Sequence, residues 1–387
     1  MFFPKEDKTA QLLSAAAIFA VGFLMRPIGA WLMGIYSDRH GRKSGLALSV
    51  ALMAGGSMLI AVAPTYAQAG AVAPAVLVIA RMLQGLSVGG EYGASATYLS
   101  EMALRDRRAF WASFQYLTLV GGQLLALGVV VLLQSAMSEA EVQERGWRIA
   151  FGVGAVLALA VYVLRTRLAE TKSFTNLSGD RPRSTIVNLW RAHPREFLIV
   201  AAISGGGSAA FYAYTTYMQK FLTNTSGFSR TAATEIMTVA LIVFMLIQPI
   251  WGMAADRWGR KLNLYVFGFG GVLASVPIFS LISRAPTPLS ALALTLVPLV
   301  LLGAYTSISG LFKAELFPAH LRTLGVALPY AVGNTLFGGT AEYVALWFKQ
   351  AGIEAGFYWY LTAVIGMAAV AFIMLPETKT TSQILED

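Results

Sequence analysis

The sequence has no cysteine and only three histidines among its 387 residues. Without thiols the chain can form neither a disulfide nor a thiolate metal site, and so few histidines disfavour a histidine-based metal cluster. Charge is also scarce, because 13% of the residues are charged, whereas soluble globular proteins have roughly 25%. We therefore expect no metal and no cofactor, and a protein that lies largely in lipid.

Long uncharged runs confirm that a bilayer is the expected environment. Ser44–Ala63 and Ala150–Leu164 carry no charge and approach the roughly 20 residues that span a membrane. Apolar windows predict about 11 spans. They cover residues 10–33, 45–64, 74–100, 109–134, 147–166, 196–219, 231–254, 262–283, 288–312, 322–348 and 356–375.

The formal net charge of +9 comes from basic residues in the connections between spans. No single basic face forms, so we expect no nucleic-acid partner. Lysine and arginine are dense in alternate connections, such as the one with Arg39, Arg42 and Lys43. This bias predicts that those connections and the C-terminus are cytoplasmic. An odd number of spans then places the N-terminus outside, although MFFPKEDKTA shows no signal peptide.

The chain repeats itself. GIYSDRHGRK (Gly34–Lys43) returns as GMAADRWGRK (Gly252–Lys261), and ETK at Glu170–Lys172 returns at Glu377–Lys379. A glutamate also precedes an arginine by the same spacing in Glu101/Arg108 and in Glu315/Arg322. The repeat predicts two similar helical bundles, residues 1–164 and 196–387, which are joined by a cytoplasmic linker, residues 165–195.

These doubled motifs resemble the major facilitator superfamily. GFLMRPIGAWLMG, ARMLQGLSVGGEYGASATYLSE, ASFQYLTLVGGQLLAL, YTSISGLFKAELFP and GGTAEYVAL are similar to its metabolite:proton symporters. The resemblance implies an all-α membrane protein of two pseudo-symmetric bundles that rock about a central site. It also implies a monomer that imports α-ketoglutarate or a similar dicarboxylate with protons across a bacterial cytoplasmic membrane.

The resemblance also predicts a helix that this chain does not match. Such symporters begin with a helix carrying a G-N-x-x-E-W-F-D-F-like stretch, and FFPKEDKTAQLL looks like the connection after it. We therefore expect the first of twelve helices to be missing. A truncated gene, a misplaced start codon and a shorter protein remain open explanations.

The charged stretch around Asp38 has two interpretations. A topology signal with a tight turn would account for its basic residues but not for the aspartate, which contributes little to that signal. The family resemblance implies instead that such residues form latches that hold the cytoplasmic side shut. We favour gating, with candidates Asp38, Arg39, Gly41, Arg42, Glu101, Arg108, Asp256, Arg257, Gly259, Arg260, Glu315 and Arg322.

Polar residues inside the spans are candidates for substrate binding. Arg26 and Arg81 should face a cavity or a partner, because a charge at membrane depth is costly. Guanidinium groups bind carboxylates bidentately, which suits an organic anion with two carboxylates. The alternative is internal pairing that only fixes helix packing. The substrate-binding candidates are Arg26, Arg81, Gln84, Tyr92, Gln115 and Tyr212.

Proton coupling needs a carboxylate whose charge can change in a poorly solvated site. Glu91 and Glu342 are the candidates within the spans, and we slightly favour a static role for Glu342. Other hypotheses are a symporter for citrate, shikimate or proline and betaines, and a truncated membrane protein that does not transport. An enzyme is disfavoured, because no nucleophile, base and orienting partner stand at a defined spacing.

Overall fold

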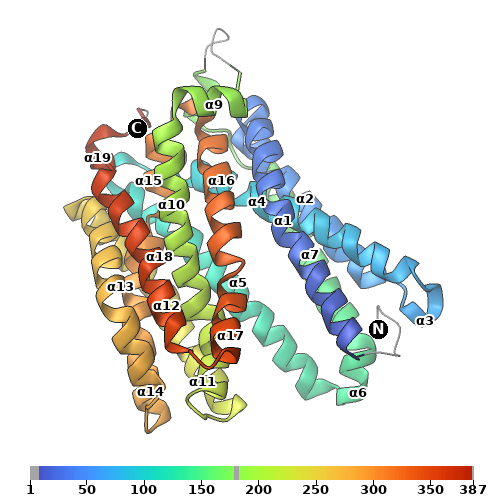
Figure 1. Cartoon of the computed structure of the whole chain (residues 1–387). Helices are drawn as coiled ribbons and strands as arrows, with labels where there is room; N and C mark the ends of the chain where they lie inside the picture. Colours follow the sequence, from blue (N-terminus) through green and yellow to red (C-terminus); the bar gives the residue numbers. More distant parts are fainter. Residues whose placement is uncertain (1–7, 178–182, 386–387) are drawn as a thin grey trace.

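The computed structural model describes residues 8–177 and 183–385 (Figure 1), and all regular structure within these ranges is helical. The first group of helices comprises α1 (Lys8–His40), α2 (Arg42–Val62), α3 (Tyr66–Ala69), α4 (Val72–Met102), η1 (Arg105–Arg107), α5 (Arg108–Ala136), α6 (Glu139–Glu141), η2 (Val142–Gly146) and α7 (Trp147–Thr166). Two short helices, α8 (Lys172–Thr175) and α9 (Ile186–Ala192), lie in the connection to the second group.

The second group begins at α10. It comprises α10 (Pro194–Phe211), η3 (Tyr212–Tyr217), α11 (Met218–Asn224), α12 (Arg230–Trp258), α13 (Arg260–Ile282), α14 (Pro288–Thr306), α15 (Ser309–Leu316), η4 (Ala319–Leu321), α16 (Arg322–Gly333), η5 (Asn334–Gly338), α17 (Ala341–Gln350), α18 (Ala355–Met374) and α19 (Thr378–Thr381).

Each predicted span falls on a helical segment. Within the described ranges, nine segments are long and apolar enough to cross a membrane. The other two predicted spans correspond to α1 and to the run from α16 through η5 to α17. Helices are the expected outcome in lipid, because they satisfy every backbone hydrogen bond within the segment.

A glycine in a left-handed conformation separates the helices that carry the repeated motif. Gly41, between α1 and α2, has φ 104°, and Gly259, between α12 and α13, has φ 97°. Only glycine adopts such φ values without a steric penalty. The motif therefore specifies the same sharp turn twice, and each turn places Asp and Arg on either side of it.

The two groups of helices share a packing plan. α4 packs against α1 and α2 in the first group, as α14 packs against α12 and α13 in the second. Likewise, α7 lies on α2 as α18 lies on α13. The groups meet where α1 packs against α16 and where α12 packs against α5. The ends of α1 and α12 that carry the repeated motif, with the starts of α16 and α5 beside them, lie at the top of Figure 1 and are called the latch end here.

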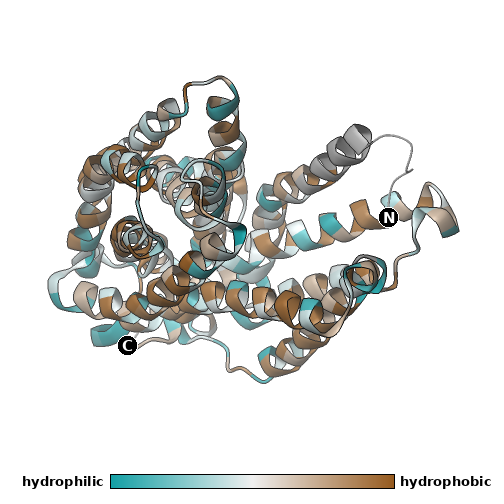
Figure 2. Cartoon of the chain, turned by 90° about the horizontal axis from the view of Figure 1, so that it is seen from below, coloured by the Kyte–Doolittle hydropathy of each residue, from teal (hydrophilic) through white to brown (hydrophobic). Residues whose placement is uncertain are grey.

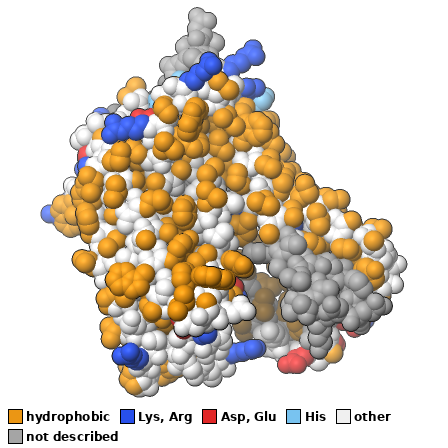
Figure 3. Space-filling view, viewed as in Figure 1, with side chains coloured by type: hydrophobic (Ala, Val, Ile, Leu, Met, Phe, Trp, Pro, Cys, Tyr) orange, Lys and Arg blue, Asp and Glu red, His pale blue; other side chains and the backbone are white. Residues whose placement is uncertain are grey.

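The second group is the more closely packed. Seen from below, the helices near the N-terminus spread apart, whereas those on the opposite side of the molecule lie close together (Figure 2). α10 is largely buried against α16 and α18, whereas most of α7 is exposed. Hydrophobic side chains cover the middle of the visible face, with lysine and arginine towards its upper and lower edges (Figure 3). Such a surface suits a membrane.

Candidate functional site

A cavity of about 1000 Å³ lies between the two groups of helices. Its walls come from α1, α2, α4, α5 and α7 on one side, and from α10, η3, α16 and η5 on the other. The lining is mostly apolar with a small set of polar side chains, as in many small-molecule sites. The polar members include Arg26, Glu91, Tyr92, Ser95, Gln115, Thr118, Gln123, Arg165, Ser208, Tyr212, Tyr330 and Asn334.

Arg26 brings a cation to this cavity from α1. Its Nη1 donates a hydrogen bond to the Tyr212 hydroxyl at 3.0 Å, and its guanidinium carbon lies 3.7 Å from the centre of the Phe23 ring. Within the described part of the chain no carboxylate forms an ion pair with Arg26. Its remaining N–H donors are therefore suited to an anionic ligand.

Two π-helical turns shape the wall opposite Arg26. Tyr212 opens η3 and Asn334 opens η5, and both residues line the cavity. Such turns are rare overall, but they are often found at functional sites. They interrupt the regular register of side chains along a helix. Sequence reasoning missed Asn334, since an asparagine in an apolar run has no periodic partner.

The latch-side wall of the cavity is built on two stacked tyrosines. The rings of Tyr92 and Tyr330 lie 3.4 Å apart between centroids at an interplanar angle of 9°. Gln115 donates from Nε2 to the Tyr92 carbonyl at 3.2 Å and to Ser95 Oγ at 3.1 Å. Tyr92 and Gln115 were predicted from the sequence, whereas Tyr330 was not.

A buried lysine stands directly behind this stack. Lys313 Nζ donates to the Tyr92 hydroxyl at 2.9 Å and to Ser309 Oγ at 3.0 Å, and the side chain is fully buried. Sequence reasoning missed Lys313, although it lies inside the YTSISGLFKAELFP stretch. A charged residue directly after an apolar span was the available signal.

The two predicted proton-coupling candidates lie apart. Glu91 lines the cavity and pairs with Arg165 of α7 at 2.6 Å, with 31% of the Glu91 side chain and 19% of the Arg165 side chain exposed. Glu342, in α17, pairs with Lys220 in α11, and both side chains are partly exposed. Of these two carboxylates, only that of Glu91 lies in the wall of the cavity. A role in proton coupling stays a prediction for both residues.

Arg81 and Gln84 lie outside the lining of this cavity. Arg81 Nη1 donates to Gln84 Oε1 at 3.2 Å, and Gln84 Nε2 donates to Ser57 Oγ in α2 at 3.2 Å. Arg81 is also roughly 30 Å along α4 from the latch residue Glu101, at a 1.5 Å rise per residue. The structure thus separates the two predicted arginines, and the substrate role of Arg81 and Gln84 stays a prediction.

At the latch end, Asp38 of α1 binds the N-terminus of α16. Its carboxylate oxygens accept hydrogen bonds from the backbone N–H of Thr323 at 3.0 Å and Leu324 at 3.1 Å, and Ser184 Oγ donates to it at 3.0 Å. The first N–H groups of a helix lack partners within it, and its dipole favours an anion there. Asp38 therefore fastens the first group of helices to the second.

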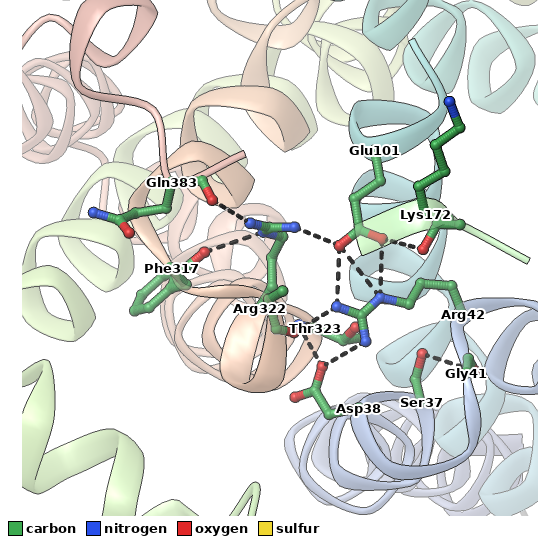
Figure 4. Close-up of polar contacts among 12 residues, drawn as sticks. Ser37, Asp38, Gly41, Arg42, Glu101, Lys172, Phe317, Arg322, Thr323 and Gln383 are labelled. Carbon is green, nitrogen blue, oxygen red and sulfur yellow. Dashed lines mark hydrogen bonds and ion pairs between the residues drawn. The ribbon is translucent and has the colours of Figure 1, made fainter. Parts of the chain in front are cut away.

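Glu101 lies between two guanidinium groups beside Asp38 (Figure 4). Its Oε1 is 3.0 Å from Arg42 Nη2 in its own group and 2.6 Å from Arg322 Nη1 in the other, and all three side chains are buried. Arg42 also pairs with Asp38 at 3.4 Å and donates to the Ala319 carbonyl at 2.5 Å. These contacts and those of Asp38 form the first latch.

A second latch repeats this arrangement between α12 and α5. Asp256 accepts from the backbone N–H of Ala109 at 2.9 Å and Phe110 at 2.8 Å, at the N-terminus of α5. Arg260 pairs with Asp256 at 3.4 Å and with Glu315 at 3.2 Å. Arg108, at the start of α5, is buried and acts on Glu315 electrostatically.

The repeated ETK segments support both latches from outside the bundles. Glu170 accepts from the backbone N–H of Arg42 and Lys43 at the start of α2, and Glu377 accepts from those of Arg260 and Lys261 at the start of α13. Two further gating candidates lie at the rim. Arg39 donates to the Ser184 carbonyl at 3.0 Å, and the exposed Arg257 lies over the Trp258 ring.

Known proteins match nearly the whole chain. The family model described as Sugar (and other) transporter matches residues 2–187 and 180–385. The chain is 50% identical over 374 residues to the alpha-ketoglutarate permease of Escherichia coli (strain K12), covering 97% of the chain and 85% of that protein. It is 32% identical over 395 residues to the citrate-proton symporter of Salmonella typhi, covering 97% and 87%.

A further relative is the inner membrane metabolite transport protein YhjE of Escherichia coli (strain K12), 30% identical over 385 residues with 98% of this chain and 88% of that protein covered. Among solved structures, the proton:xylose symporter XylE bound to 6-bromo-6-deoxy-D-glucose superposes with a TM-score of 0.83 at 18% identity, covering 98% of this chain and 90% of that one. That likeness shows the all-α fold of two bundles. The chain therefore belongs to the sugar and other transporter family of the major facilitator superfamily, and it is a membrane transporter.

Proposed function

We propose that this protein imports α-ketoglutarate or a similar dicarboxylate by proton symport through alternating access. The observation that carries the proposal is Arg26, a cation in the wall of a cavity between two bundles, with no ion-pair partner among the described residues. The relative with 50% identity is an alpha-ketoglutarate permease, and another is a citrate-proton symporter. Both relatives are named for a di- or tricarboxylate cargo.

Arg26 is the proposed anchor for one substrate carboxylate. Tyr212 holds its guanidinium by one hydrogen bond, which leaves donors for a bidentate contact with the ligand. Tyr92 and Gln115 line the same cavity and supply hydroxyl and amide groups for the rest of the molecule. Arg81 and Gln84 then serve to fix α4 against α2, as their bonds to each other and to Ser57 suggest.

The latches supply the moving contacts. Both join the two bundles at one end. Each includes an aspartate that accepts hydrogen bonds from a helix N-terminus of the opposite bundle. Such a contact is made or lost as a unit, which suits an interface with two discrete arrangements. In the proposed cycle, substrate enters from the end opposite the latches, and rocking breaks both latches to release it.

Glu91 is the proposed proton-coupling carboxylate. It lines the cavity and forms an ion pair with Arg165 at 2.6 Å, in which both side chains remain partly exposed. Protonation of Glu91 would free Arg165 and change the charge of the cavity wall. Glu342, paired with Lys220 away from the cavity lining, is proposed as a static partner.

The latch end is proposed to face the cytoplasm of a bacterial cell. The basic residues Arg39, Arg42, Lys43, Arg257 and Lys261 gather there, as the positive-inside rule requires, and α19, the last helix, lies at the same end (Figure 1). We further propose a monomer with no enzymatic role. The bundle boundaries at residues 164 and 195 stay predictions.

Uptake into proteoliposomes tests the proposed function. The purified chain should accumulate labelled α-ketoglutarate when the outside is acidic, and excess unlabelled dicarboxylate should block the signal. Citrate, shikimate, proline and glycine betaine serve as competing cargo. Uptake that follows one of these compounds instead would reassign the substrate, and uptake unaffected by a proton gradient would remove symport.

Arg26 gives the sharpest variant for this assay. Arg26→Gln removes a charged contact with the substrate, and we expect the KM for α-ketoglutarate to rise roughly 10- to 100-fold, because hydrogen bonds to charged groups contribute about 1.5–3 kcal/mol. Lys349→Gln, a loss of positive charge in α17 beyond the cavity lining, is the matched control. An unchanged KM in Arg26→Gln would exclude this residue as the anchor.

A further inference from the structure

Lys313 is a fully buried lysine that none of the latch contacts uses. Its Nζ donates hydrogen bonds to the Tyr92 hydroxyl at 2.9 Å, to Ser309 Oγ at 3.0 Å and to the Tyr305 hydroxyl at 3.5 Å. All three acceptors are uncharged hydroxyl groups. The ammonium also lies 4.6 Å from the centre of the Tyr330 ring.

Within residues 8–177 and 183–385, no carboxylate pairs with the Lys313 side chain. Among the residues that the structure describes, none of the ion pairs involves Lys313. A buried ammonium without a counter-ion is costly, and hydroxyl groups and aromatic faces offset that cost only in part. By contrast, the buried guanidinium groups of Arg42 and Arg322 share Glu101. Lys313 is therefore suited to an anion that arrives from outside the chain.

The internal repeat separates Lys313 from the latches. Glu101 and Glu315 are equivalent latch residues, and Leu99 stands before Glu101 where Lys313 stands before Glu315. Leu99 lines the cavity. The latch is thus built in the first bundle without a lysine at this position. Lys313 therefore has a role that the first bundle lacks. Recognition of an asymmetric cargo is such a role, because each bundle contacts a different part of the molecule.

Lys313 lies within reach of the cavity through a single side chain. Tyr92 lines the cavity and stacks on Tyr330, while its hydroxyl receives the hydrogen bond from Lys313 and shares another with Ser309 Oγ at 2.9 Å. When Ser309 is the donor in that bond, the Tyr92 hydroxyl proton is free to bind a ligand in the cavity. The lysine side chain leans towards the N-terminus of its own helix, which brings Nζ from the latch level towards the cavity. A phenol that accepts a hydrogen bond from an ammonium becomes a stronger donor in turn, because hydrogen bonds in a chain polarise one another.

We propose that Lys313 is a specificity-determining positioning residue, which acts through the Tyr92 hydroxyl to bind the second carboxylate of the substrate. Arg26 receives one carboxylate, and the Lys313–Tyr92 pair favours a cargo with another. Because this role presupposes a dicarboxylate, it rests on the proposed function. It adds the reason why a dicarboxylate would be preferred to a monocarboxylate of the same length.

The test compares α-ketoglutarate with 2-oxopentanoate, which has the same chain length but one carboxylate. Transport of each is measured in proteoliposomes for the wild type, Lys313→Gln, Lys313→Arg, Tyr92→Phe and the control Lys349→Gln, with thermal unfolding in detergent recorded for all. Lys313→Gln keeps polar atoms at the site but removes the charge. Lys313→Arg keeps the charge.

We expect Lys313→Gln to raise the KM for α-ketoglutarate by roughly 10-fold or more while changing kcat and the KM for 2-oxopentanoate much less. Tyr92→Phe should reproduce this loss of preference, and Lys313→Arg should restore part of it. Lys349→Gln should behave as the wild type.

Four results would overturn the inference. The first is an unchanged preference in Lys313→Gln. The second is an equal loss for both cargoes together with a lower unfolding temperature, which would mark Lys313 as a purely structural link between α15 and α4. If Lys313→Gln does not fold, an unchanged preference in Tyr92→Phe decides against it. A wild type that transports neither compound would refute the proposed function itself, and this role with it.

Discussion

The two latches begin from the same local sequence but close the molecule unequally. In both, an aspartate accepts two backbone N–H groups at a helix N-terminus of the opposite bundle. The first latch adds an ion pair of 2.6 Å across the bundles, Glu101 with Arg322, whereas Glu315 in the second pairs at 3.2 Å with Arg260 of its own bundle. The Asp38 side chain is fully buried, and that of Asp256 is 11% exposed.

This difference shows which part of a latch is local and which is tertiary. The turn and the aspartate follow from the repeated decapeptide, so they recur faithfully. The ion pair of the glutamate across the interface depends on how closely α16 and α5 approach the opposite bundle. It therefore differs between Glu101 and Glu315. We infer that the first latch carries more of the closure, and the following variants test that inequality from the largest expected effect to the smallest.

Glu101→Gln should have the largest effect. It leaves the guanidinium groups of Arg42 and Arg322 buried without their shared counter-ion, and breaking a buried pair in this way costs about 3–5 kcal/mol. We expect a clear drop in the unfolding temperature in detergent and a loss of uptake. Glu315→Gln should cause a smaller drop, since it removes an ion pair within one bundle and only a longer-range attraction to Arg108 across the bundles. The reverse order would refute the proposed inequality.

Substitution of the turn glycines should have an intermediate and equal effect. Gly41→Ala and Gly259→Ala force alanine into φ values of 104° and 97°, at about 1–3 kcal/mol each. A methyl group would also displace the carboxylate of Glu170 or Glu377 from the helix that follows. Thermal unfolding of the two variants should agree closely. A large difference between them would show that this part of the latch is not set locally.

Asp38→Asn should act on gating rather than on membrane insertion. An amide keeps one acceptor oxygen but loses the charge that binds the N-terminus of α16, a loss of about 1–2 kcal/mol. Uptake should fall while the protein still inserts, and Asp256→Asn should lower uptake less. Unchanged uptake in Asp38→Asn would remove the latch role.

Latch opening can be read directly, because the chain has no native cysteine. Ser37, next to Asp38, is fully buried, so a Ser37→Cys variant should react slowly with maleimide. Adding Asp38→Asn should speed that reaction more than adding Asp256→Asn does. Equal labelling rates in the two double variants would indicate latches of equal strength.

Much of the cavity was beyond sequence reasoning, for reasons that particular residues make clear. Arg26 and Arg81 look alike in the sequence, as single arginines in apolar spans, yet only Arg26 lines the cavity. Which face of α1 or α4 points inward depends on the neighbouring helices. Tyr330 and Asn334 were missed because they follow no polar stripe, and they meet the cavity only through the packing of α16 and the π-helical turn η5.

The sequence by itself determined the class of structure, the helices and the doubled latch motif. Hydrocarbon leaves the backbone no alternative to helix, and glycine alone suits the repeated turn, so both are readable one residue at a time. Only the tertiary structure decided that Asp38 binds α16, that Glu101 joins Arg42 to Arg322, and that Lys313 lies behind Tyr92. Those contacts join segments far apart in the chain, and their geometry exists only once the two bundles have packed together.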